Sequence, residues 1–109
     1  MRLSEYQRAS RRTATYPDVG ENLVYPTLGL AGEAGEVAEK VKKLLRDDGG
    51  IMSEERRAAL AGELGDVLWY VAQIATEADL DLEALALANL EKLRSRARRG
   101  VLSGSGDRR

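Results

Sequence analysis

The sequence predicts an all-α protein, and three observations support that prediction. Ala, Leu, Glu and Arg, which are good helix formers, dominate the 109 residues, whereas Phe is absent and Ile and Thr are few. Apolar residues recur at helical spacing between turn and capping residues. A short motif also occurs twice, which indicates two helices with matching faces. We therefore expect a four-helix bundle-like protomer in which two long antiparallel helices carry the motif, assembled as an oligomer.

The first two helices are bounded by proline and by turn residues. We expect one helix over residues 2–14 and a second that begins between residues 22 and 26 and ends at residue 46. Pro26 is compatible with the second helix only in its first turn, because proline lacks the backbone N–H that a helix interior requires. The sequence DDGG at residues 47–50 then ends this helix.

Capping residues define the other two helices. Ser53 is a suitable N-cap for a helix over residues 54–79, and Asp81 for a helix over residues 82–99 that Gly100 stops. We expect residues 1–100 to form a single all-α domain. We expect residues 101–109 to be a flexible, basic Gly/Ser tail.

Absent residue types exclude several kinds of site. The chain has no Cys and no His, which excludes disulfides, thiolate nucleophiles, Ser-His-Asp triads and zinc sites built from thiolate or imidazole. Any metal must bind through oxygen atoms, which favours Mg²⁺ or Mn²⁺. No apolar run approaches the length of a membrane span, so we expect a soluble, cytoplasmic protein without membrane association.

Charge is unevenly distributed, although the formal net charge is only −1. Residues 1–15 carry four Arg and one Glu. Residues 16–91 carry six basic and sixteen acidic side chains, and residues 92–109 carry seven basic side chains and one Asp. An acidic centre is thus flanked by two basic segments. This distribution disfavours a stable nucleic-acid complex, because phosphate binding needs a contiguous basic face.

The repeated motif reads LAGEAGEV at residues 30–37 and LAGELGDV at residues 60–67. At about 100° per residue, an apolar stripe runs along each helix from the leading leucine. Each copy places two carboxylates at about 60° and about 120° to the same side of that stripe. These four acids are Glu33, Glu36, Glu63 and Asp66. Antiparallel packing would gather them beside the core, where their repulsion calls for a compensating cation.

A simpler reading treats the acids of these helices as solvated surface charges paired with lysines. Glu36–Lys40 and Glu39–Lys43 have the i, i+4 order that supports a helix. We accept this reading for Glu39, whose equivalent in the second copy is Trp69. For the duplicated carboxylates, the repetition favours a metal site.

Four glycines lie inside the repeat and cost up to about 1 kcal/mol each relative to Ala in a helix. They are Gly32, Gly35, Gly62 and Gly65. Close approach of helices or subunits explains such a cost, and so does room for a ligand beside the carboxylates. The sequence does not separate these two explanations.

The two motifs together resemble the MazG-type nucleotide pyrophosphohydrolases of the all-α NTP pyrophosphatase superfamily. The signature of that family is EExxE followed by ExxD, and this chain has GEAGE at residues 32–36 and ELGD at residues 63–66. Gly32 replaces the first Glu of the signature and removes any water-orienting role of that side chain. The resemblance implies a metal set of Glu33, Glu36, Glu63 and Asp66.

The resemblance also implies an activity. This activity is Mg²⁺-dependent hydrolysis of an NTP or dNTP between the α and β phosphates, giving NMP and pyrophosphate in nucleotide-pool housecleaning. Carboxylate-held Mg²⁺ would neutralise phosphate charge and activate a water molecule, and Mn²⁺ is the alternative ion. A carboxylate that the metal does not saturate would accept the proton of this water, and Glu33 and Glu36 are the candidates.

Side chains outside the motifs are candidates for binding the substrate: Asn89, Lys92, Arg94, Arg99, Arg109, Tyr6, Gln7 and Arg11. The Asn and Lys of the fourth helix have counterparts in a comparable segment of the family. The basic side chains of that helix and of the tail suit the phosphates distal to the metal, with a solvated end as the alternative for the terminal Arg run. The first-helix residues are candidates for contact with base or ribose.

Subunit contact is expected because a chain of this length has a limited core. We expect a homodimer or homotetramer with sites near subunit interfaces. Trp69 projects opposite the apolar stripe and would be exposed in a lone protomer. A large exposed aromatic side chain marks an interface more often than not, so we assign Trp69 to subunit contact first and to base stacking second.

Two other functions stay open at the level of sequence. A non-enzymatic helical interaction or regulatory module predicts neither phosphate release nor metal dependence. A dUTPase-like all-α hydrolase would use a related site, and the sequence does not choose the base or the sugar of the substrate.

Overall fold

The structure is a computed structural model that describes residues 1–100. Within that range the chain forms only helices, and the all-α fold class predicted from the sequence is confirmed. The helices are α1 (Leu3–Arg11), α2 (Val24–Asp48), α3 (Glu54–Glu77) and α4 (Leu82–Arg99). In this part of the chain, no helix combines the length and the apolar character needed to cross a membrane.

The helix boundaries have local causes, although α2 extends to Asp48 instead of residue 46 and α3 ends at Glu77 instead of residue 79. Ser53 Oγ accepts a hydrogen bond from Arg56 N (3.1 Å), and Asp81 Oδ1 accepts one from Glu83 N (3.3 Å). Gly49 and Gly100 end α2 and α4 with φ of 60° and 72°, which is left-handed backbone that favours glycine.

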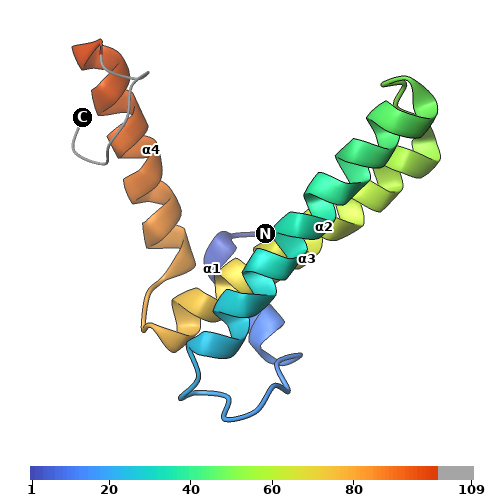
Figure 1. The fold of residues 1–109 in the computed structure, drawn as a ribbon. Coiled ribbons are helices and arrows are strands. Elements are labelled where there is room, and N and C mark those ends of the chain that lie inside the picture. The colour runs from blue at the N-terminus through green and yellow to red at the C-terminus, as the bar shows by residue number, and fades with distance from the viewer. Residues whose placement is uncertain (101–109) are drawn as a thin grey trace.

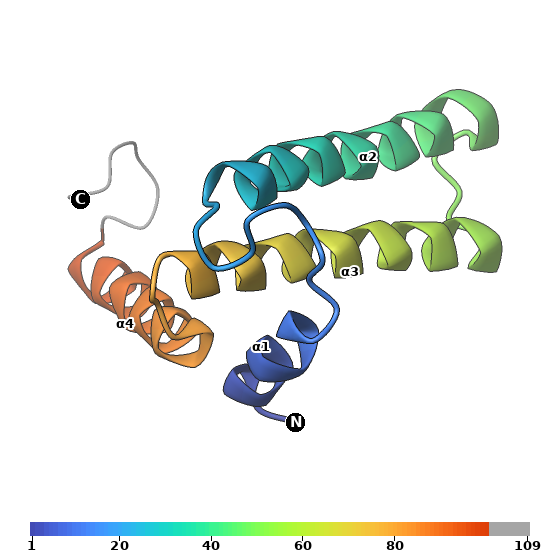
Figure 2. The same cartoon turned by 90° about the horizontal axis from the view of Figure 1, so that it is seen from below.

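The first helix is shorter than predicted because its C-terminal turn tightens. The N–H groups of Thr13 and Ala14 donate to the carbonyls of Ser10 and Arg11, three residues earlier. The Thr13 hydroxyl also donates to the Ser10 carbonyl at 2.6 Å. Residues 12–23 then leave the helix and lead across α3 to the start of α2, as Figure 2 shows.

The helices α2 and α3 form the long antiparallel pair that the repeat predicts (Figure 1). The short helix α1 packs against α3 and contacts the start of α4. Figures 1 and 2 show that α4 then diverges from the α2–α3 pair, so it does not lie alongside that pair as the fourth helix of a closed bundle. The turn before α4 has a cause: Asp79 adopts φ 58°, and Leu80 N donates to the Ala75 carbonyl at 2.7 Å.

The core of the single chain is small. It contains the buried apolar side chains of Tyr16, Leu44, Ala72, Ala75 and Leu82. The fold of one chain covers only part of the apolar stripe predicted along α2 and α3, and several of its side chains remain exposed to solvent. These include Val41, Leu45 and Leu64, which are 39%, 65% and 51% exposed.

Candidate metal centre

Three acidic side chains meet between α2 and α3. Glu33 belongs to α2, and Glu63 and Asp66 lie about one turn apart on α3. One carboxylate oxygen from each side chain lies within 4.8 Å of the other two. The antiparallel pairing of the two motif copies therefore brings together three of the four acids for which the sequence predicts metal binding.

The raised pKa of Glu33 reflects the negative charge that is concentrated in this cluster. Hydrogen bonding with Glu63 raises the pKa of Glu33 above its usual value, and desolvation and the charges of Asp66 and Glu36 raise it further. Glu33 Oε2 is buried and has no hydrogen-bond partner within residues 1–100. A buried carboxylate oxygen without a partner, beside two further carboxylates, fits a hard divalent cation bound through oxygen.

Glu36, the fourth predicted ligand, borders this cluster. It lies one turn beyond Glu33 on α2 and is exposed. It does not belong to the group whose oxygens lie within 4.8 Å of one another. Its charge still contributes to the raised pKa of Glu33. Glu36 therefore faces solvent at the edge of the site.

Lys40 supplies positive charge at the end of the cluster nearer the α2–α3 connection. Its Nζ lies 3.9 Å from Glu63 Oε1, and the two side chains are 29% and 20% exposed. Sequence reasoning placed Lys40 only as an i, i+4 partner of Glu36. Its approach to Glu63 depends on the register between α2 and α3, which helical periodicity alone does not give.

Tyrosine side chains border the cluster elsewhere. Tyr70 lies one turn after Asp66, and its ring packs so closely against Gly29 of α2 that a Cβ at that position would clash with it. Burial raises the pKa of Tyr70, and the charges of Tyr25, Glu33 and Asp66 add to this effect. Burial and then the charge of Asp66 also raise the pKa of Tyr6 on α1, so Tyr6 lies within electrostatic reach of the cluster.

The expectation that Trp69 is exposed in a lone protomer is wrong. Trp69 Nε1 donates to Thr13 Oγ1 at 2.7 Å. Its ring makes edge contacts with Tyr16 and Tyr70, with centroid separations of 6.5 and 5.0 Å. The segment that follows α1 folds back over α3 and supplies these partners, which the projection of a single helix does not include.

Gln7 of α1 forms hydrogen bonds with the end of α3 and with the turn that leads into α4. Its Nε2 donates to Thr76 Oγ1 (3.0 Å) and to the Leu80 carbonyl (2.9 Å), and its Oε1 accepts from Leu82 N (2.8 Å). The amide thus makes three contacts within the chain that account for its place in the fold. Contact between Gln7 and a base or ribose stays a prediction.

Arg11 belongs to a second network, centred on Glu77. The Glu77 side chain is 1% exposed and accepts hydrogen bonds from Arg11 Nη2 (2.7 Å), the Tyr16 hydroxyl, Gly20 N (2.9 Å) and Asn22 N (3.0 Å). Burial alone raises the pKa of Glu77, but these hydrogen bonds outweigh it and lower the pKa to about 2. Sequence reasoning missed Glu77, and it assigned Arg11 only to nucleotide contact, which stays a prediction.

The α4 candidates lie away from the carboxylates within one chain. Because α4 diverges from the α2–α3 pair, the chain does not by itself bring them to the cluster (Figure 1). Asn89 and Lys92 do share one face of α4 and line a shallow hollow there. Arg94 and Arg99 lie further along the same helix. Arg109 and the predicted tail at 101–109 lie outside the described residues.

The glycines of the repeat do not serve close packing within the chain. All four are exposed, and no heavy atom lies within 4 Å of a Cβ built at any of them. Close approach of α2 to α3 is therefore excluded as their explanation in the single chain. They leave open space on the exposed surfaces of the two helices that carry the carboxylates.

Fold and site together define an all-α protein in which two antiparallel helices present a cluster of carboxylates suited to a divalent cation. Residues 26–101, which contain both motifs, match the MazG nucleotide pyrophosphohydrolase domain, and the chain belongs to this family. It is 52% identical to the Gene 37 protein of Mycobacterium phage L5, over 114 aligned positions that cover all of both chains. No solved structure gives a significant match.

Proposed function

We propose that this protein is a Mg²⁺-dependent pyrophosphohydrolase. It cleaves an NTP or dNTP between the α and β phosphates and releases NMP and pyrophosphate, in nucleotide-pool housecleaning, with Mn²⁺ as the alternative ion. The observation that carries the proposal is the cluster of Glu33, Glu63 and Asp66. Membership of the MazG family supports the reaction type.

In this proposal the three clustered carboxylates hold the cation. A divalent ion supplies charge neutralisation for the phosphates and lowers the pKa of a water molecule. The water oxygen bonds to the α phosphorus while the bond from that phosphorus to the bridging oxygen breaks, so that pyrophosphate leaves. Glu36 accepts the water proton, because it lies beside the cluster but outside the group of three. Glu33 is the second candidate for this role.

A second copy of the chain completes the site in our proposal. Apolar side chains on the α2–α3 pair are open to solvent, among them Leu28 and Leu64, which are 67% and 51% exposed. We take these exposed side chains as part of a subunit interface, because large exposed apolar patches are typical of such interfaces. A homodimer or homotetramer built on it would let α4 of one copy bring Asn89 and Lys92 to the cluster of another.

The test of the proposal compares three single variants with the parent protein. Asp66→Ala removes a clustered carboxylate and Glu36→Ala removes the proton acceptor. Glu39→Ala is the control, because Glu39 pairs with Lys42 on the outer surface at 3.2 Å. We expect the first two variants to lose at least about a hundredfold in turnover while keeping their helical content, and the control to keep its activity.

Turnover is measured as pyrophosphate release from a panel of NTPs and dNTPs with Mg²⁺ or Mn²⁺, and helical content by circular dichroism. If Asp66→Ala and Glu36→Ala hydrolyse substrate at the parent rate, the site assignment is wrong. If the parent releases no pyrophosphate from any nucleotide, the non-enzymatic module is the better reading.

A further inference from the structure

We propose that Lys40 and Lys43 form a subsite for the pyrophosphate end of the substrate, on the side of the carboxylate cluster that faces the α2–α3 connection. This inference rests on the proposed function. It assigns the direction in which a bound triphosphate runs along α2, and it places the distal phosphates against side chains of the same chain that supplies the carboxylates.

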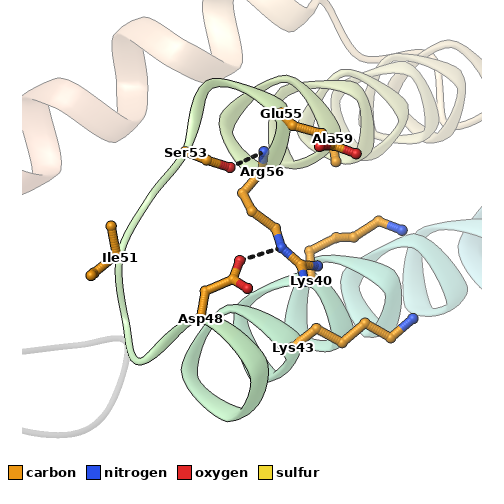
Figure 3. A pocket seen from close by; sticks show the side chains of 8 residues that line it. All are labelled: Lys40, Lys43, Asp48, Ile51, Ser53, Glu55, Arg56 and Ala59. Atoms are coloured by element: carbon orange, nitrogen blue, oxygen red, sulfur yellow. Dashed lines mark hydrogen bonds and ion pairs between the residues drawn. The ribbon is translucent and has the colours of Figure 1, made fainter.

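The first observation is a hollow at the end of the α2–α3 pair. It has a volume of about 590 Å³, and its lining residues are Lys40, Lys43, Asp48, Ile51, Ser53, Glu55, Arg56 and Ala59. Figure 3 shows that the amino groups of both lysines point along α2 away from the connection. That direction leads toward the half of α2 that carries Glu33 and Glu36.

The second observation is that Lys40 joins this hollow to the carboxylate cluster. Lys40 lines the hollow, and its Nζ also lies 3.9 Å from Glu63 Oε1. Glu36, Lys40 and Lys43 follow one another along α2 at intervals of one helical turn, about 5.4 Å. A polyphosphate whose α phosphate lies at the carboxylates can therefore extend over the lysines.

The hollow has more basic than acidic side chains in its lining, with Lys40, Lys43 and Arg56 against Asp48 and Glu55, and this balance supports an anionic occupant. Arg56 is already engaged, because its Nε lies 2.7 Å from Asp48 Oδ2 and its guanidinium lies 3.9 Å from Asp47. Within residues 1–100, Lys43 makes no ion pair. Lys43 thus supplies a positive charge outside any ion pair, although it is near enough to Glu39 and Asp47 to contribute to the lowered pKa of both carboxyl groups. Two lysine amino groups suit a pyrophosphate group, whose oxygens they can meet with charge-assisted hydrogen bonds.

The test measures binding of inorganic pyrophosphate to the full chain by isothermal titration calorimetry with Mg²⁺ present. Lys43→Ala and Lys40→Ala are compared with Lys42→Ala. Lys42 is the matched control, because it lies on the same helix, is 60% exposed and pairs with Glu39 instead of lining the hollow. We expect each subsite variant to weaken binding at least about tenfold and the control to stay within about twofold of the parent.

A second measurement distinguishes binding of the nucleoside monophosphate end of the substrate from binding of its pyrophosphate end. Binding of a nucleoside monophosphate should change by less than about twofold in Lys43→Ala, because the α phosphate lies at the carboxylates. The inference is overturned if the parent does not bind pyrophosphate, if Lys42→Ala loses as much affinity as Lys43→Ala, or if Lys43→Ala binds pyrophosphate like the parent. Failure of the proposed function is read separately, as absence of nucleotide hydrolysis by the parent protein.

Discussion

Glu33 of α2 and Glu63 of α3 approach each other across the antiparallel pair, so that a carboxylate oxygen of one lies within 4.8 Å of a carboxylate oxygen of the other. The pKa of Glu33 is raised because a hydrogen bond between the two carboxyl groups requires a proton on one of them, and because desolvation and the neighbouring carboxylates also disfavour its charged form. The pairing favours folding at acid pH and opposes it when both groups are ionised. A cation between them would replace the proton near neutral pH.

The first prediction concerns this pair and metal removal. Because the pKa of Glu33 is higher in the folded state, its contribution to stability is present below its unfolded pKa, about 4.3, and is lost as pH rises through the raised value. In EDTA, the Tm of the parent should fall over that range relative to Glu33→Gln. Near neutral pH, Mg²⁺ or Mn²⁺ should raise the Tm of the parent and not that of the variant. A parent Tm that neither ion changes would contradict the metal site.

The second prediction concerns Glu77, whose pKa is lowered to about 2 by the network with Arg11. Its contribution to stability is present above the unfolded pKa of about 4.3 and is lost as pH falls toward 2. Glu77→Gln should lower the free energy of unfolding by about 3 kcal/mol at neutral pH and flatten its dependence on acid pH. Urea unfolding at neutral and acid pH measures both effects.

The control for that experiment is Glu91→Gln. Glu91 pairs with Arg98 at 3.2 Å, but both side chains are 65% exposed, so its loss should cost less than about 0.5 kcal/mol. Equal losses in the two variants would show that Glu77 does not hold α1 and the segment at 12–23 in place.

The third prediction compares two glycines of α2. Gly29→Ala should destabilise the protein by about 1–3 kcal/mol, because the new Cβ meets the Tyr70 ring. Gly32→Ala should stabilise it by up to about 1 kcal/mol, since its Cβ meets no atom within 4 Å and Ala favours the helix. Thermal unfolding of the two variants measures the difference, and a stabilising Gly29→Ala would refute the contact with Tyr70.

The fourth prediction concerns assembly. Leu64→Glu places a charge on the exposed apolar face of the α2–α3 pair and should convert the proposed oligomer to a monomer. Leu80→Glu is the control, because Leu80 is 52% exposed in the α3–α4 turn, outside that face. Light scattering after size-exclusion chromatography gives the mass of each. A parent that is already monomeric would contradict the shared site.

Local chemistry made much of this fold predictable. The caps at Ser53, Asp81 and Gly100 need only neighbouring backbone atoms, so the helix limits follow from sequence. The meeting of Glu33 with Glu63 was also predictable, because the repeat gives both helices the same face. The features that could not be predicted depend on how distant segments meet in space.

Three such features are the direction of α4, the covering of Trp69 and the contact of Lys40 with Glu63. The first follows from the Asp79 backbone and from Gln7, which lies far from it in sequence. Trp69 is covered by the non-helical segment after α1, and the position of such a segment cannot be predicted from helical periodicity. The Lys40 contact depends on the register of two helices whose pairing the repeat fixes only to about a turn.

The reaction catalysed by the carboxylate cluster is identified by its products, which ³¹P NMR detects after incubation of the parent with Mg²⁺ and each NTP or dNTP in turn. If the carboxylate cluster directs cleavage between the α and β phosphates, at least one nucleotide should give NMP and pyrophosphate in equal amounts, and Asp66→Ala should give neither. Formation of NDP and orthophosphate, or no turnover of any nucleotide, would show that the cluster does not direct cleavage between the α and β phosphates.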